Sequence, residues 1–204
     1  MNQHLNPVFN ILLPSLEKEG VDCWVFGGVG VAAYAGEFIR PNGDVDTFVK
    51  EIDFNKARAV LNKVCESNSY RLIPHIPAVG RPKLDIKING KERFSVMPIY
   101  VKDNAVDFKF GDVTDHYPLE ILDKVERNID GNKFFTPSNK YIKQIFINHL
   151  KDRTDKISRP KIRTDISKRI VIISNGKMSF LNFSRFIILN AKYTEQIERK
   201  SQMI

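Results

Sequence analysis

Cysteine is scarce in this sequence. Among 204 residues only Cys23 and Cys65 are present, and they are not spaced as a Cys-x-x-Cys pair. Two isolated cysteines support neither a disulfide framework nor a zinc site. We therefore expect both thiols to be small core residues in a reducing compartment, which favours the cytoplasm.

Histidine is also scarce, with four residues at His4, His75, His116 and His149. They are scattered and show no spacing that metal ligands require. We assign none of them a catalytic role. His116 comes nearest to one, because it lies just past a predicted strand and could serve as a base.

Long apolar runs are missing as well. No segment approaches the roughly 20 apolar residues that span a bilayer, and the first 20 residues lack the pattern of a signal peptide. We expect no membrane partner. Internal repeats and low-complexity segments are absent too, and 42% hydrophobic with 27% charged residues is typical of an ordinary globular protein.

The charge balance is basic. The formal net charge is +8, which favours anionic partners such as nucleotides, nucleic acid or phosphorylated metabolites, although solubility alone would also explain it. Basic residues gather in 151–169, KDRTDKISRPKIRTDISKR. This segment is either a solvated face or a contributor to binding an anionic ligand or nucleic acid.

Hydrophobic periodicity predicts a mixture of helices and strands. Helices are expected at 6–18, 29–35, 53–67, 119–126 and 138–150. Strands are expected at 21–26, 44–49, 84–88, 93–101, 105–110 and 132–135. Asn89-Gly90 predicts a tight hairpin turn, and the proline-containing stretch 71–82 is interpreted as a loop. The order predicts an α+β fold, with one domain at 1–115 and a mostly helical region at 116–204.

The stretch 24–50 carries the clearest chemical pattern. A short apolar run meets Gly27-Gly28 and a compact helix, and backbone N–H groups at a helix N-terminus bind phosphate without any side chain. Asp44 and Asp46 follow at the start of a strand, where alternate residues share one face. Two carboxylates at that spacing could hold a hard divalent cation beside a polyphosphate.

This stretch resembles the nucleotidyltransferase superfamily (polymerase-β-like), whose motif is Gly-Gly or Gly-Ser, a short helix, and then Asp-x-Asp or Asp-x-Glu. It is closest to the small bacterial lincosamide and aminoglycoside nucleotidyltransferases. Gly36 and Arg40 stand where that family has a glycine after the helix and an arginine before the Asp pair, while Asn42 replaces a frequent histidine. The similarity covers about residues 8 to 170 and is most specific in the first fifty.

The resemblance implies a small mixed sheet with flanking helices and a helical C-terminal part. It also implies Mg²⁺-dependent transfer of a nucleoside monophosphate from a nucleoside triphosphate to an acceptor hydroxyl, with release of pyrophosphate. Asp44 and Asp46 would be the catalytic pair that holds Mg²⁺ in a two-metal site. Gly27, Gly28 and Arg40 would bind the nucleotide. The acceptor could be a small molecule, an RNA or a protein hydroxyl.

One position departs from the family. The family has a third carboxylate, which helps to hold a second metal and to deprotonate the acceptor. In this sequence Ser95 occupies that position, and serine is a poor metal ligand and no useful base. A two-residue turn at Asn89-Gly90 would pair Asp85 with Phe94 and would turn Asp85 away from the face of Ser95. The other nearby acids are expected on the wrong face or beyond the strand end: Glu92, Asp107 and Asp112. A β-bulge would reverse these assignments.

Three functions therefore stay open. The first is an active nucleotidyltransferase. The second is a nucleotide-binding or regulatory member of the fold that kept the Asp pair and lost the base. The third is the toxin component of a two-protein system. Metal-dependent nucleotide binding separates the first two from proteins without a nucleotide site, and pyrophosphate release separates them from each other.

Overall fold

The computed structural model of the protein describes residues 2–75, 82–110 and 113–151. Met1–His149 forms one compact unit, and nearly all of the second unit, Leu150–Ile204, lies outside the described residues. The described part of the region expected to be mostly helical, 116–151, contains strands as well as helical segments. The rest of that region, and the basic segment 151–169 apart from the helix-ending residue 151, stay predictions.

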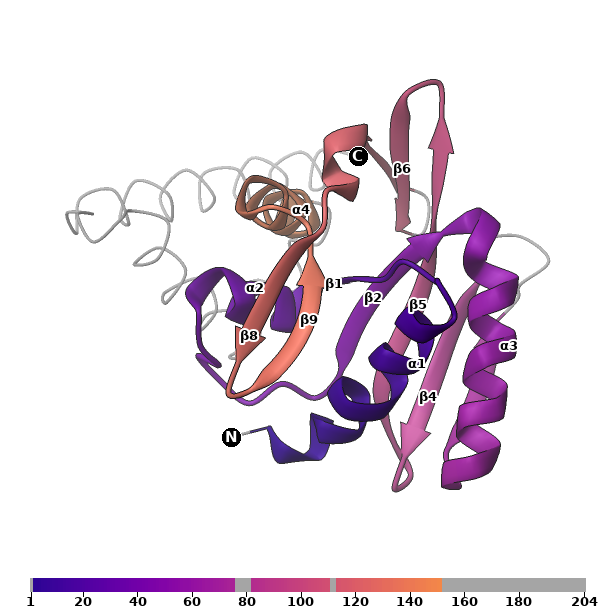
Figure 1. The fold of residues 1–204 in the computed structure, drawn as a ribbon. Helices are drawn as coiled ribbons and strands as arrows, with labels where there is room; N and C mark the ends of the chain where they lie inside the picture. Colours follow the sequence, from indigo (N-terminus) through magenta and orange to yellow (C-terminus); the bar gives the residue numbers. More distant parts are fainter. Residues whose placement is uncertain (1, 76–81, 111–112, 152–204) are drawn as a thin grey trace, which may run out of the picture. The chain divides into compact units, whose positions relative to one another are not determined.

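A seven-stranded mixed sheet forms the centre of the first unit (Figure 1). Its central order is β1-β2-β5-β4-β3, and β6 and β7 extend from β5. β2 and β5 are parallel, and the other neighbours are antiparallel. The strands are β1 (Trp24–Phe26), β2 (Val45–Lys50), β3 (Arg71–His75), β4 (Lys83–Ile88), β5 (Lys91–Lys102), β6 (Ala105–Phe110) and β7 (Val113–Pro118).

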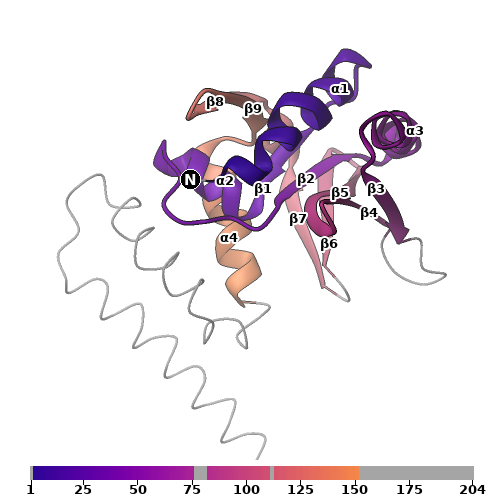
Figure 2. The same ribbon diagram turned by 90° about the horizontal axis from the view of Figure 1, so that it is seen from below.

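The helices and a separate hairpin flank this sheet. The hairpin consists of β8 (Val125–Ile129) and β9 (Asn132–Thr136). The helical segments are η1 (Gln3–Leu5), η2 (Val8–Leu12), α1 (Leu13–Lys18), α2 (Gly27–Ala35), α3 (Glu51–Asn68), η3 (Leu119–Leu122) and α4 (Asn139–Lys151). Figure 2 shows α1 and α3 on one side of the sheet and α4 on the other.

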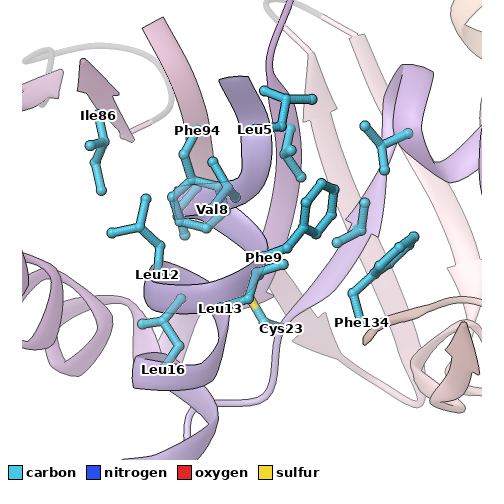
Figure 3. Close-up of a cluster of buried hydrophobic side chains, with 14 of the residues drawn as sticks. Leu5, Val8, Phe9, Leu12, Leu13, Leu16, Cys23, Ile86, Phe94 and Phe134 are labelled. Atoms are coloured by element: carbon cyan, nitrogen blue, oxygen red, sulfur yellow. The ribbon is translucent and has the colours of Figure 1, made fainter. Parts of the chain in front are cut away.

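Each face of the sheet has its own hydrophobic core. The first core joins η2 and α1 to one face of the sheet, where Leu12 and Leu16 lie near Ile86 and Phe94 (Figure 3). The second core is aromatic. It includes Trp24, Phe48, Phe108, Tyr117 and Tyr141, and the rings of Phe48 and Phe108 meet edge to face with centroids 4.7 Å apart. Because side chains alternate along a strand, the residues directly before and after a residue of one core point to the opposite face of the sheet.

Most of the predicted elements are confirmed, and two are corrected. The stretch 71–82 was interpreted as a loop, but Arg71–His75 forms β3, because antiparallel pairing with β4 satisfies its backbone in spite of Pro74. The helix expected at 119–126 is a single turn, Leu119–Leu122, and strand β8 begins at Val125. The boundary expected near residue 115 falls inside β7, and the first unit continues to His149.

The expectation for the two cysteines is also met. Cys23 and Cys65 are buried, free thiols. None of the helices in the described ranges combines the length and hydropathy that a membrane span needs.

Candidate nucleotide and metal site

The turn between β1 and α2 brings a glycine backbone against a carboxylate. Gly27 has a φ of +63°, and a Cβ atom placed on it would lie 2.6 Å from Oδ2 of Asp46. Both the left-handed backbone and the close approach therefore require glycine here. The register of β1 and β2 explains the contact, because Phe26 pairs with Asp46 and Gly27 follows directly. The predicted phosphate-binding turn and the predicted metal ligand thus touch.

Gly28 is equally tight, against the loop that precedes β2. A Cβ atom on Gly28 would lie 2.6 Å from Oδ1 of Asn42 and 2.7 Å from Nη2 of Arg40. Arg40 was predicted to bind nucleotide, and its guanidinium lies at the N-terminus of α2, where backbone N–H groups favour an anion. Asn42 is buried, and within the described part of the chain its Oδ1 has no hydrogen-bond partner.

The loop carrying Arg40 and Asn42 is held by the N-terminal residues, which sequence reasoning had not connected with the site. The backbone N–H of Asn42 donates to Oδ1 of Asn2 over 2.7 Å, and the carbonyl of Asn42 lies 2.7 Å from Nε2 of His4. These contacts join residues about 40 positions apart, so no local pattern could have indicated them.

Asp46 occupies a half-buried position in a row of side chains across the sheet. In register, Phe26 of β1, Asp46 of β2, Ser95 of β5 and Asp85 of β4 are successive neighbours. Burial raises the pKa of Asp46 from 3.8 to about 7; the carboxylates of Asp44, Glu92 and Asp85 also raise it, and the Lys83 ammonium lowers it. Negative charge therefore accumulates at this end of the sheet.

The structure corrects the predicted direction of Asp85. A two-residue turn does form, with positive φ at Asn89 and Gly90, but the β4–β5 register shifts between Ile86 and Lys87, so that Asp85 pairs with Ser95 and not with Phe94. This is the bulge that reverses the face of every later side chain. The Ser95 hydroxyl donates to Oδ1 of Asp85 over 2.7 Å.

The predicted direction of Glu92 is also wrong. Its Oε1 accepts a hydrogen bond from the Ser95 hydroxyl over 3.2 Å, so its carboxylate reaches the face that carries Asp46. The inserted residue of the bulge, Arg93, donates from Nη1 to the carbonyl of Gly43 over 2.7 Å. The bulge therefore also ties β5 to the residue directly before Asp44.

Two further side chains join this group without having been predicted. Nζ of Lys83 lies 2.7 Å from Oδ1 of Asp85 and 3.3 Å from Oε1 of Glu92. Burial lowers the pKa of Lys83, but these two carboxylates outweigh that effect and raise it overall. Nε2 of His75 lies 2.9 Å from Oδ2 of Asp85. The alternation Lys-x-Asp on β4, which puts Lys83 and Asp85 on one face, is the sequence signal that could have indicated this pair.

His116 lies away from the site. It is within β7, where its Nδ1 is 2.6 Å from Oδ1 of Asp107. Asp107 pairs with Tyr100, and its neighbour Phe108 points to the aromatic core that contains Phe48. Since Phe48 and Asp46 share a face, Asp107 and His116 belong to the opposite one.

The donor set fits one Mg²⁺ ion shared with a nucleotide. Mg²⁺ is usually held by one or two carboxylates together with substrate phosphates, and Asp44 and Asp46 supply that number of hard oxygen ligands. The raised pKa of Asp46 indicates that a counter-ion would be favourable there. Within residues 2–75, 82–110 and 113–151, no three His, Cys, Asp or Glu side chains form a complete metal-binding group.

Comparisons with solved structures identify the fold. The chain is similar to the antibiotic-resistance factor ANT(2″)-Ia, seen in complex with adenylyl-2″-tobramycin, with a TM-score of 0.56 and 15% identity over 96% of this chain and 99% of that one. It is similar to a lincomycin-bound lincosamide antibiotic adenylyltransferase, with a TM-score of 0.50 and 19% identity over 71% of this chain and 85% of that one.

A third similar structure is an antigenic nucleotidyltransferase-like protein from Paracoccidioides brasiliensis, with a TM-score of 0.51 and 18% identity over 85% of this chain and 77% of that one. No family model matches the sequence, and no curated protein matches it. The chain thus has a nucleotidyltransferase fold, as the resemblance implied.

Proposed function

We propose that the protein is a Mg²⁺-dependent nucleotidyltransferase, which moves a nucleoside monophosphate from a nucleoside triphosphate to an acceptor hydroxyl and releases pyrophosphate. The observation that carries the proposal is the contact between Gly27 and Asp46, in which a Cβ atom would be 2.6 Å from the carboxylate oxygen. A helix N-terminus suited to phosphate and a carboxylate suited to Mg²⁺ are thereby placed side by side on a nucleotidyltransferase fold.

Each predicted residue has a defined part in this proposal. The N–H groups of Gly27 and Gly28 would approach the β- and γ-phosphates, because neither glycine carries a side chain of its own that could block this approach. The Arg40 guanidinium neutralises phosphate charge. Asp44 and Asp46 would hold Mg²⁺, which polarises the phosphate oxygens and neutralises charge on the leaving pyrophosphate when it is bound.

The acceptor is a hydroxyl compound, and small molecules are the first class to test. One of the similar structures is bound to lincomycin and another is in complex with adenylyl-2″-tobramycin. The similarity covers 99% of the second chain. RNA and protein hydroxyls stay in the test as well; for RNA, one of the two readings of the basic segment 151–169 is a contribution to binding nucleic acid.

Calorimetry with ATP, GTP, CTP and UTP, each with and without Mg²⁺, tests the nucleotide site. We expect binding that requires Mg²⁺ and is lost in the double variant Asp44→Asn, Asp46→Asn, since each carboxylate contributes a metal ligand. Pyrophosphate release is then followed with lincosamides, aminoglycosides, RNA and protein as acceptors. A nucleotide affinity that is the same with and without Mg²⁺, and the same in the double variant as in the wild type, would refute the proposed site.

A nucleotide-binding member of the fold without transferase activity is the second candidate. The observation that favours it is Ser95, which stands beside Asp46 in register and offers no carboxylate. Metal-dependent binding together with no pyrophosphate release from any acceptor would support this candidate over the first.

A further inference from the structure

The polar network around Ser95 supplies what that residue lacks. The Ser95 hydroxyl is directed to two carboxylates, at 2.7 Å from Oδ1 of Asp85 and 3.2 Å from Oε1 of Glu92. Nζ of Lys83 bridges the same two oxygens at 2.7 and 3.3 Å. The carboxylates of Asp85 on β4 and of Glu92 on β5 therefore both reach Ser95, the residue that pairs with Asp46. They differ in how accessible they are to a substrate.

Asp85 is buried and contacts only protein groups among the described residues. Its side chain is only 6% exposed, and three partners surround it: the ammonium of Lys83, the ring of His75 at 2.9 Å and the hydroxyl of Ser95. These contacts occupy both carboxylate oxygens of Asp85, Oδ1 by Lys83 and Ser95 and Oδ2 by His75. Its burial also keeps it from any hydroxyl that enters from solvent. Asp85 accordingly acts as the anchor of Lys83.

Glu92 differs from Asp85 in each respect. Its side chain is 38% exposed, its two hydrogen bonds are longer, and both fall on Oε1. Its Oε1 lies 3.2 Å from the hydroxyl of Ser95, which is the register neighbour of Asp46 on β5. Glu92 is thus the acid that is both near the Asp pair and open to a ligand.

We propose that Glu92 is the catalytic residue that takes the proton of the attacking hydroxyl, and that Lys83 and Ser95 are positioning residues that hold it. This inference rests on the proposed function and deepens it. The bulge at Ile86 and Lys87 is what brings Glu92 to this face.

The proposed transfer forms one P–O bond, breaks another and moves one proton, and it needs no further reactant. The acceptor oxygen attacks the α-phosphorus of the triphosphate and forms a new P–O bond, while its proton passes to the Glu92 carboxylate. The bond between the α-phosphorus and the bridging oxygen breaks, and its electron pair leaves with pyrophosphate. Lys83 remains protonated between Glu92 and Asp85, so it orients the base without taking part in the transfer.

The test measures turnover and nucleotide affinity separately, in the full chain with Mg²⁺, a nucleotide and the acceptor that the panel identifies. Glu92→Gln keeps the shape of the side chain and removes the base, so we expect turnover to fall by about 100-fold or more while the nucleotide Kd stays within about threefold. Glu92→Asp keeps the base and should retain more turnover than Glu92→Gln.

Two further variants separate catalysis from structure. Glu126→Gln is the matched control, because Glu126 is an exposed acid of β8 whose Oε1 lies 3.9 Å from Nζ of Lys133; its turnover should match the wild type. Asp85→Asn tests the buried acid, and we expect a lower melting temperature and a smaller loss of turnover than in Glu92→Gln.

The inference is overturned if Glu92→Gln turns over like Glu126→Gln, if Asp85→Asn loses more turnover than Glu92→Gln, or if Glu92→Gln loses nucleotide affinity in place of turnover. These results leave the proposed function standing as long as the wild type transfers. A wild-type protein that binds Mg²⁺ and nucleotide but transfers nothing overturns both the inference and the proposed activity.

Discussion

Replacing Asp46 with asparagine should stabilise the protein while removing its proposed metal ligand. Asparagine has nearly the same shape, so it fits against Gly27 and beside Ser95. What changes is the charge, which in the wild type is half-buried and faces the carboxylates of Asp44, Glu92 and Asp85. Sites of this kind are expected to cost stability in exchange for function.

The magnitude follows from the pKa of Asp46. A rise from 3.8 to about 7 corresponds to roughly 4 kcal/mol at about 1.36 kcal/mol per unit. The side chain is partly exposed, and solvent screens part of this cost, so we expect Asp46→Asn to raise the free energy of unfolding by about 2 kcal/mol in EDTA at pH 8.

The effect has a defined pH window. Because the pKa of Asp46 is higher in the folded than in the unfolded chain, its contribution to stability is fully favourable below about pH 4 and is lost as the pH rises towards 7. The advantage of Asp46→Asn should therefore be near zero at pH 4 and largest at pH 8.

Urea unfolding followed by tryptophan fluorescence suits this measurement, because Trp24 is the single tryptophan and is 1% exposed in the second core. Asp103→Asn is the control, since that carboxylate is 86% exposed and its removal should change stability by no more than about 0.5 kcal/mol. Saturating Mg²⁺ and ATP should stabilise the wild type, by about 2.7 kcal/mol at 100 times Kd, and leave Asp46→Asn unchanged. A variant no more stable than the wild type at pH 8 in EDTA would refute the reasoning.

Two other substitutions probe the turn and the network. Gly27→Ala should lower the free energy of unfolding by about 1–2 kcal/mol, because alanine is strained in the left-handed backbone. It should also abolish nucleotide binding in calorimetry, because its Cβ atom would displace the adjoining carboxylate. Gly43→Ala is the control and should bind nucleotide as the wild type does, because a Cβ atom there meets nothing within 4 Å. Lys83→Met should lower the free energy of unfolding in urea by about 1–3 kcal/mol, because Asp85 loses its ammonium partner. Lys102→Met is the control and should have little effect, since Lys102 is 78% exposed. Equal losses in both variants would contradict the assigned role of Lys83.

Local patterns predicted the elements that depend on neighbours in sequence. The glycine pair that opens α2, the left-handed Gly36 that ends this helix, and the Asn-Gly turn between β4 and β5 are all present. In each case a few adjacent residues decide the backbone conformation. β3 was missed because its strand character comes from pairing with β4 and not from its own proline-containing sequence.

The candidate site divides in the same way. Gly27, Gly28, Arg40 and the Asp pair form a contiguous motif, and the contacts at Gly27 and Gly28 bring most of it together. The acids opposite Asp46 belong to a hairpin whose register can be shifted by one bulge without any change in its hydrophobic pattern. The prediction named that reversal but took the unshifted register, and it therefore placed Asp85 and Glu92 on the wrong side.

The sequence by itself determined the turn proposed to bind phosphate and the Asp pair, because their spacing is short and the chemistry of glycine and carboxylate is local. Only the tertiary structure decided what completes the site. The bulge between Ile86 and Lys87 directs Asp85, and with it Lys83 and Glu92, to Ser95, since a shift of one residue moves every later side chain to the other face of a sheet.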